Sequence, residues 1–387
     1  MGADLVRQQI ILVAIGRRLQ AGRRVRGHGL QRNRRGHRRV GRRPYPPRVY
    51  REHRSYLQLS EEQCITRLRF RKDVLTEICQ LLQADLQPTS ANRTALPVEV
   101  KVTAALAFYA SGSFQAAAGD ICSISQHAAH SCIHQVTRAL YARRMDFINF
   151  PMSSDSQIER ALGFGRIAGF PKVQGAIDCT HVALRAPLHN TEVFRNRKGY
   201  DSLNVQLVCD HTQRILAVNA CYPGSTHDAF ILHESSVSQM FQRQRQGQGW
   251  LIGDKGYGLA TWLMTPLRNP ATEAEQRYNE GHAATRKIIR QTIGVLKQRF
   301  RCLDRSGGSL QYFPQQVSEF IVVCCMLHNL AIMKGQALPV GIAGPTQEEE
   351  DEGDEPIAEP LHPQGRQCGD AATAGALLRQ LIIDQFA

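Results

Sequence analysis

Three aspartates in the second half of the chain have the type and placement of a metal site. Asp178 and Asp254 each close a predicted strand, and Asp228 lies in the first turn of a predicted helix. Carboxylates at the ends of neighbouring strands can converge in one crevice. Like charges that are a few ångströms apart cannot all stay ionised unless a cation neutralises them. Oxygen donors without a Cys or His set favour Mg²⁺ or Mn²⁺.

Such a site would suit phosphodiester cleavage. Two divalent ions about 3.5–4 Å apart activate a water and stabilise the leaving oxygen. The alternative is that each aspartate caps a turn or a helix, which is a common structural role for this residue. The shared placement at strand and helix ends favours the metal site over three unrelated caps.

The elements that must position these aspartates follow from the hydrophobic periodicity. The pattern changes from helical to strand-like after a polar stretch at 155–169. Three strands are expected next, and the second and third of them form a hairpin across residues 211–214. A helix follows from about Ser225. The remaining expected elements are strands at 173–178, 202–210, 215–221 and 249–254, and helices at 283–300 and 317–333. Strands followed by alternating strand and helix predict an α/β domain over 170–335.

The preceding residues, 56–150, have helical periodicity and predict a separate all-helical domain. Segments 113–122 and 126–142 are separated by a short turn, which is the spacing of a helix-turn-helix. His134 and Arg138 share a face of its second helix and are candidate DNA-binding residues. A metal site on the histidines of that helix, a solvated face and simple packing of the two helices are the alternatives.

The charge is distributed unevenly along the chain of 387 residues. Residues 1–55 contain sixteen arginines and only two acids, which accounts for the whole net charge of +14, and we expect them to be a disordered Arg-rich tail. The body at 56–340 is mildly basic. Residues 341–387 predict an acidic tail with a short terminal helix. Clustered cations favour a polyanion partner such as nucleic acid.

The cysteines and the apolar segments bear on the cellular setting. Eleven scattered cysteines, without a preceding signal peptide, favour a reducing intracellular environment. The apolar stretch at 10–15 is too short to span a bilayer and is followed at once by arginines. We therefore expect no transmembrane segment.

Several motifs in the same order resemble the PIF/Harbinger transposases of the DDE superfamily and, more closely, the nucleases derived from harbinger transposases. The resemblance covers about residues 56–340. The motifs that carry it are YASGSFQ at 109–115, GAIDCTHV at 175–182, NRKGYDSLNVQLVCD at 196–210, PGSTHD at 223–228, GDKGY at 253–257, YN with His282 and Arg286, TIGVLKQRFRCL at 292–303 and CMLHN at 325–329.

The resemblance implies an RNase H-like nuclease domain that uses an Asp, Asp, Glu set on a divalent metal and follows a helical region. Asp178 and Asp254 match the catalytic aspartates, and Asp228 matches a further metal ligand. The family works with a Myb-like DNA-binding partner protein, which implies a nuclear and also cytoplasmic location. It also implies a nuclease that acts on DNA without transposition. A homo-oligomer is compatible with it, and a membrane role is not implied.

One position departs from the family pattern. Arg290 stands where the family has its glutamate, 36 positions after Asp254. An arginine about 5 Å from a divalent ion would be repelled by about 6–7 kcal/mol at an effective dielectric constant of 20. Arginine is long enough to turn its charge into solvent or onto DNA phosphate, which would reduce that cost. Glu280 is a conceivable substitute for the missing carboxylate.

Three functions therefore compete. The first is a metal-dependent DNA nuclease. The second is a catalytically impaired module that binds DNA or a partner protein because Arg290 replaces the glutamate. The third is a protein scaffold without nucleic-acid contact, for which the acidic tail is the main argument.

Other residues have candidate roles beside structural ones. His181 could orient a water or contact phosphate. Arg195, Arg197 and Lys198 form a loop that could bind the DNA backbone, or a solvated charged loop. Cys325 and His328 have a spacing that could suggest zinc, but they lie in an apolar helix without further ligands, so we expect them in the core.

Overall fold

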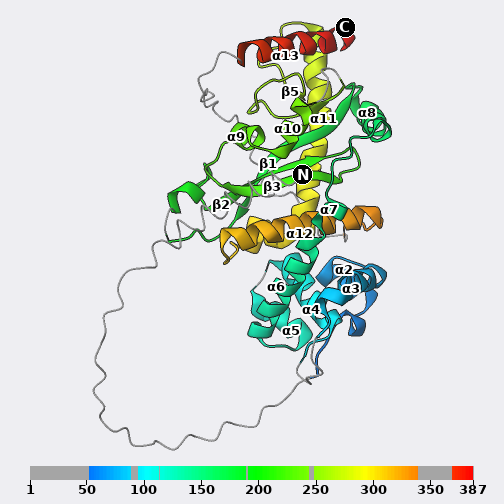
Figure 1. Ribbon diagram of the computed structural model, residues 1–387, viewed down its shortest axis with the longest axis vertical. Helices are drawn as coiled ribbons and strands as arrows, with labels where there is room; N and C mark the ends of the chain where they lie inside the picture. The colour runs from blue at the N-terminus through cyan, green and yellow to red at the C-terminus, as the bar shows by residue number, and fades with distance from the viewer. Residues whose placement is uncertain are drawn as a thin grey trace, which may run out of the picture. The chain divides into compact units, whose positions relative to one another are not determined.

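A five-stranded mixed sheet lies at the centre of the protein (Figure 1). The computed structural model describes residues 52–88, 95–112, 114–188, 191–243, 248–338 and 368–386. The strand order is β3-β2-β1-β4-β5, in which β1, β2 and β3 are antiparallel and β4 and β5 run parallel to β1. The strands are β1 (Val173–Ala183), β2 (Ser202–Cys209), β3 (Ile215–Pro223), β4 (Trp250–Ile252) and β5 (Leu263–Met264).

The register of the sheet aligns two of the predicted site residues. Ala176 of β1 pairs with Ile252 of β4, so Asp178 and Asp254, each two residues further on, lie level with each other. The prediction that the first strand ends at Asp178 is wrong, because β1 continues to Ala183. The added residues are held by antiparallel pairing with β2, from Asp178 opposite Leu207 onward. Asp178 therefore lies in the middle of a strand and has a rigid backbone.

Different helices pack against the two faces of the sheet. Ala176 and Val182 of β1 belong to a large core that includes residues of two long helices, α11 and α12. Ile177 belongs to a smaller core that includes residues of two short helices, α9 and α10. Since successive side chains of a strand point to opposite faces, Asp178 points towards α11 and Cys179 towards α9. The four helices are α9 (Asp228–His233), α10 (Ser236–Gln242), α11 (Glu273–Arg299) and α12 (Pro314–Met333).

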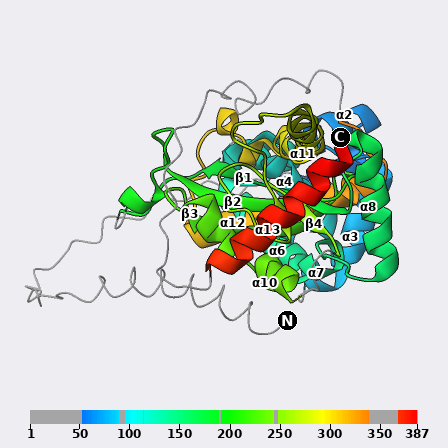
Figure 2. The ribbon, with the colours of Figure 1, turned by 90° about the horizontal axis from the view of Figure 1, so that it is seen from above.

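Helix α11 is longer than predicted. Thr272 and Glu275 form a capping box at its N-terminus, with the Thr272 hydroxyl accepting from the Glu275 amide, so the helix starts ten residues before the expected position. The missed signal is therefore the capping box. With 27 residues, α11 runs across the sheet and reaches the terminal helix α13 (Cys368–Ile383), which lies across its end in Figure 1 and in front of the sheet in the view from above (Figure 2).

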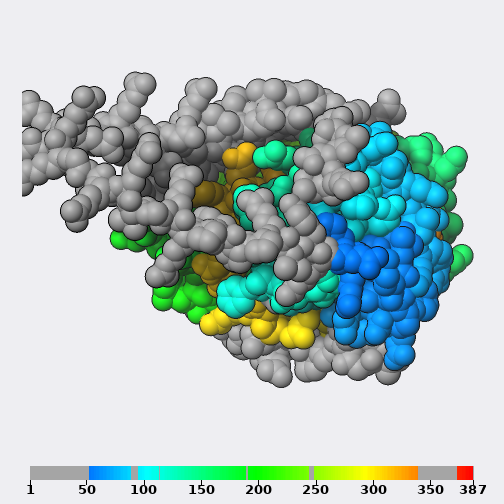
Figure 3. Space-filling view, turned by 90° about the horizontal axis from the view of Figure 1, so that it is seen from below, coloured from blue at the N-terminus to red at the C-terminus, as the bar shows by residue number. Residues whose placement is uncertain are grey.

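Residues 56–150 are helical, as the periodicity predicts. Figure 3 shows their blue and cyan residues together on one face of the molecule. The stretch at 155–169, expected only to be polar, contains a further helix, so eight helical elements precede β1 among the described residues. They are η1 (Tyr56–Gln58), α2 (Glu61–Leu68), α3 (Lys72–Leu86), α4 (Val98–Ser111), α5 (Gln115–Cys122), α6 (Gln126–Ala142), α7 (Arg144–Phe147) and α8 (Ser154–Ala168). Ser123, with a left-handed φ of 54°, ends α5, and Ser125 caps α6. The second helix thus has the predicted bounds, whereas α5 begins at Gln115, two residues after the expected position.

Helix α12 joins the helical half to the sheet. Its length and mean hydropathy of 1.6 would suffice to cross a membrane, but 78% of that window is buried inside the protein. Residues from 56–150 and from 170–335 contribute to the same large core. The predicted division into two domains stays a prediction. The predictions for residues 1–51 of the Arg-rich tail and for the acidic residues 341–367 lie outside the described residues.

Asn329 of α12 makes the contacts that hold this junction. It is fully buried, and its side chain accepts from the Ile215 amide at 2.8 Å. The same side chain donates to the Ile215 carbonyl at 2.7 Å and to the Phe147 carbonyl at 3.0 Å. One side chain therefore satisfies backbone groups of β3 and of the segment after α6.

Replacing Asn329 with alanine should lower the free energy of unfolding by about 2–4 kcal/mol, because buried backbone groups lose their partners. Urea denaturation at neutral pH would measure the loss. Gln315→Ala, at an exposed position of the same helix, should change stability by less than about 0.5 kcal/mol. Equal stabilities of the two variants would contradict the assigned role of Asn329.

Candidate active site

Asp178 and Asp254 converge on one arginine of α11. The Arg286 guanidinium donates to Asp178 Oδ2 at 2.9 Å through Nη2, and its Nη1 lies 2.8 Å from Asp254 Oδ1. The Arg286 and Asp178 side chains are 13% and 14% exposed, and that of Asp254 is 30% exposed. Two carboxylates that lie 76 residues apart in the sequence therefore share a single, largely buried cationic partner.

The electrostatics of this trio depend on burial. Desolvation raises the pKa of Asp178 above its ordinary value, the Arg286 charge opposes the rise, and the Asp254 charge adds to it. For Arg286, burial lowers the pKa, but the two carboxylates outweigh it, and its pKa lies above the ordinary value. The guanidinium therefore stays charged, and it stabilises the ionised carboxylates.

Arg290 lies one helical turn after Arg286, on an exposed part of α11. Partial desolvation and then the Arg286 charge lower its pKa, whereas Asp178 and Asp254 raise it. Its charge is thus felt at both aspartates. The position expected to carry a glutamate thus lies one turn from Arg286, and here it brings a second positive charge near the aspartates.

Glu280 does not take the place of that glutamate. It lies inside α11, not before it, and it is exposed. At about 100° per residue, the six residues between Glu280 and Arg286 turn the helix by about 240°, whereas Arg290 is only about 40° from Arg286. Glu280 therefore lies on a different side of the helix from the aspartates.

Asp228 does not belong to the group formed by Asp178, Asp254 and Arg286. It is the first residue of α9, and its Oδ1 accepts from Asn204 Nδ2 at 2.7 Å. It also lies beside the thiol of Cys179, whose pKa is raised well above the usual range by desolvation and next by the Asp228 charge. Because Cys179 and Asp178 point to opposite faces of β1, Asp228 is next to the face that does not carry Arg286. Its role as a metal ligand stays a prediction.

The donor set therefore fits one cation. Within the described ranges, no three side chains of His, Cys, Asp or Glu are grouped to hold a metal ion. Asp178 and Asp254 nevertheless place oxygens around a single position, which the Arg286 guanidinium now takes. A hard divalent cation bound by these two oxygen donors would compete with Arg286 for that position.

Arg286 and His282 are the residues that reasoning from the aspartates missed. His282 is buried one turn before Arg286, its Nε2 lies 3.2 Å from the Met264 carbonyl, and burial lowers its pKa to about 4. The neutral ring can donate to that carbonyl and so fixes α11 against β5. Both residues belong to the family motif, and the four-residue spacing from His282 to Arg286 and from Arg286 to Arg290 is the signal that places all three on one side of α11.

The candidate loop residues lie at the other end of β1. Arg195, Arg197 and Lys198 are exposed and follow η2 (Thr191–Phe194). His181 lies nearby on β1, and its Nδ1 lies 3.0 Å from Ser202 Oγ, to which Asn196 also donates. His181 is thus tied to the base of the loop, and its role as a phosphate contact stays a prediction.

The remaining candidates lie on helices. His134 is half-buried, with its ring 5.7 Å from that of Tyr312 and 6.0 Å from that of Phe320, whereas Arg138 is exposed. DNA binding by these two residues stays a prediction. Cys325 and His328 are fully buried in α12, and His328 Nε2 lies 2.9 Å from the Gln213 carbonyl. They lie in the core, as expected.

Comparison with known proteins agrees with the class of site. Residues 177–329 match the family model described as "DDE superfamily endonuclease", a range that includes all three aspartates and α11. The chain is 42% identical over 278 residues to the Homo sapiens protein named "Putative nuclease HARBI1", covering 72% of this chain and 79% of that protein.

Further relatives extend the comparison. The Bos taurus protein of the same name is 40% identical over 296 residues, which cover 76% of this chain and 84% of that protein. "Protein ALP1-like" of Arabidopsis thaliana is 25% identical over 335 residues, covering 80% and 77% of the two chains. No solved structure matches this chain. The chain has a DDE superfamily endonuclease domain. It belongs to the family of harbinger transposase-derived nucleases.

Replacing Arg286 with methionine should destabilise the protein by about 2–4 kcal/mol at pH 7, because two largely buried carboxylates lose their counter-charge. The pKa of Asp178 would then rise further above its unfolded value. Stability gained from the protonated form is present below the unfolded pKa and is lost as the pH rises through the folded pKa. The deficit relative to wild type should therefore grow from pH 5 to pH 8.

Urea denaturation across that pH range would measure the deficit. Lys287→Met, at an exposed position of the same helix, is the matched control and should show no such pH dependence. Adding Asp178→Asn to Arg286→Met should restore part of the stability at pH 8. A deficit that is constant with pH would contradict the proposed coupling.

Proposed function

We propose that this chain is a metal-dependent DNA nuclease that hydrolyses phosphodiester bonds and does not transpose. The observation that carries the proposal is the convergence of Asp178 and Asp254 on one cationic position between β1, β4 and α11. The sheet order β3-β2-β1-β4-β5, with three antiparallel and two parallel strands, supports an RNase H-like architecture. The family membership supports the reaction class.

The chain's own residues have distinct tasks in this proposal. Asp178 and Asp254 would hold Mg²⁺ or Mn²⁺, and Asp228 would support the site from the opposite face of the sheet. A bound divalent cation lowers the pKa of water and offsets the charge that develops on the phosphate. Arg286, once released from the carboxylates, can donate two parallel hydrogen bonds to phosphate oxygens.

A catalytically impaired DNA-binding module is the second candidate, and a specific observation favours it. Arg286 already neutralises both aspartates, and Arg290 adds a further positive charge at the site. Two arginines beside two aspartates leave no net negative charge to attract a divalent ion. The same two arginines favour the binding of a phosphate without hydrolysis.

Further proposals rest on the family resemblance. They are a Myb-like DNA-binding partner protein, a homo-oligomer, and a location in the nucleus and also in the cytoplasm. The helix pair α5 and α6 would serve as a helix-turn-helix, with His134 and Arg138 towards DNA. Arg138 is exposed, which supports such a contact.

Nicking of supercoiled plasmid with Mn²⁺ or Mg²⁺ tests the first candidate. Asp178→Ala should reduce the rate at least about hundredfold, because the cation contributes several kcal/mol to the reaction. Asp146→Ala, at an exposed position of α7, should retain the wild-type rate. Wild-type nicking that survives Asp178→Ala would sink the proposal.

Arg290→Glu separates the two candidates. It restores a carboxylate at the family position, so it should raise the nicking rate and lower the Mn²⁺ concentration for half-maximal activity by about tenfold or more. Lys287→Glu makes the same charge change at an exposed neighbouring position and should do neither. The impaired-module candidate requires that wild type binds DNA equally well with chelator, does not nick it, and gains activity only through Arg290→Glu.

A further inference from the structure

Five exposed cations from two distant parts of the sequence gather at the end of β1 that lies away from Asp254. We call them the basic cluster. Its members are Arg185, Arg195, Arg197, Lys198 and Arg305. Four come from the connection between β1 and β2, and Arg305 comes from the segment between α11 and α12. Only three of them were candidates from the sequence.

Backbone and ring contacts join the two segments. Leu310 donates its amide to the Ala183 carbonyl at 3.1 Å, and Arg185 donates its amide to the Leu310 carbonyl at 3.0 Å. The Arg305 guanidinium carbon lies 4.5 Å from the centre of the Tyr200 ring. A guanidinium on an aromatic face keeps its donors available to a phosphate. The cluster is therefore a built surface, not a chance overlap of loops.

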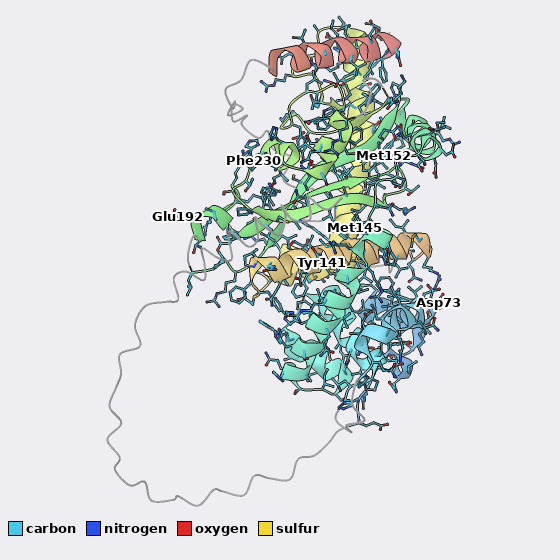
Figure 4. The ribbon with its side chains drawn as sticks, in the orientation of Figure 1. Asp73, Tyr141, Met145, Met152, Glu192 and Phe230 are labelled. Atoms are coloured by element: carbon cyan, nitrogen blue, oxygen red, sulfur yellow. The ribbon has the colours of Figure 1, made fainter. Side chains whose placement is uncertain are left out.

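The nearby acids do not cancel this charge. Asp304 accepts from the Ser306 amide at 2.7 Å and so caps its own turn. Asp201 is half-buried and lies in a backbone bridge opposite Arg195. Glu192 is exposed, and Figure 4 shows it at the outer end of the segment that projects from the sheet. Five exposed cations thus face three acids, of which one is fully exposed, and the surface suits a polyanion.

The position of the basic cluster relates it to the candidate active site. Arg185 follows Asp178 by seven residues of extended chain, which at about 3.3 Å per residue spans roughly 23 Å. Duplex DNA rises about 3.4 Å per base pair along one strand. A duplex that runs over the surface parallel to β1 would therefore meet the basic cluster about seven base pairs from the phosphate at Asp178.

We propose that the basic cluster is a phosphate-contacting surface that holds duplex DNA about seven base pairs to one side of the candidate active site. This inference rests on the proposed action on DNA, but it needs no hydrolysis. The contacts would be with the DNA backbone, so they should fix the position of the duplex and not read its sequence.

Salt-dependent DNA binding tests the proposal. The probe is a 30-base-pair duplex of mixed sequence, bound by the full chain carrying Asp178→Ala in the presence of chelator. Adding Arg185→Gln, Arg195→Gln and Arg305→Gln together should weaken binding and reduce the slope of log affinity against log salt by about two to three, close to one for each lost phosphate contact.

Two further variants make the result specific. Replacing the exposed Arg67, Arg166 and Arg243 with glutamine removes the same charge elsewhere and should leave the slope within about one of the parent. Replacing the three cluster arginines with lysine keeps the charge and should keep most of the slope. A lost slope in the lysine variant as well would show that the loss does not follow the charge of the cluster and would overturn the proposal.

The outcomes separate this inference from the proposed function. An equal loss in the cluster and control variants, or no binding by the parent chain at low salt, overturns the basic cluster as a binding surface. Binding of a single-stranded RNA in preference to the duplex would do the same. If wild type binds duplex through the cluster but nicks no plasmid, the nuclease proposal fails and the inference stands.

Discussion

One guanidinium determines the state of the candidate site. Arg286 contacts Asp178 at 2.9 Å and Asp254 at 2.8 Å, and it does so in an environment where each of the three side chains is at most 30% exposed. Without this charge, two ionised carboxylates would lie close together in a largely buried site, and their mutual repulsion would be costly. Any function of the site therefore depends on whether Arg286 keeps its contacts with the two aspartates when a cation or a phosphate binds.

The rest of the fold holds this contact in place. β1 and β4 are parallel and in a register that sets the two aspartates level, and the 27-residue helix α11 brings Arg286 across them. His282, buried one turn earlier, ties α11 to β5. Helix α12 then joins the sheet to the helical half through Asn329. A long helix that is packed against the sheet positions a charge more accurately than a loop could.

A glutamate is expected at position 290, and this chain has an arginine there. The helical position of the expected glutamate does face the aspartates, so the substitution changes the charge of the site and not merely of the surface. The positive charge at the site and the basic cluster at the far end of β1 are both suited to a phosphate backbone. In the proposed function, binding of DNA and hydrolysis of DNA rest on different side chains and can therefore be separated by substitution.

Local patterns in the sequence were enough to predict four of the five strands, most of the helices, and the pairing of Asp178 with Asp254 at the level of the strands. Periodicity reports burial, and burial is what makes these segments regular. The end of β1, the start of α11 and the partnership with Arg286 were not predictable in that way. β1 is extended by pairing with β2, and Arg286 meets the aspartates only because α11 crosses a parallel strand pair. The placement of Asp228 was not predictable either. It lies beside Cys179, which points to the face of β1 opposite to that of Asp178. Residue types are local information, whereas the distance between charges from separate segments is decided by how those segments pack.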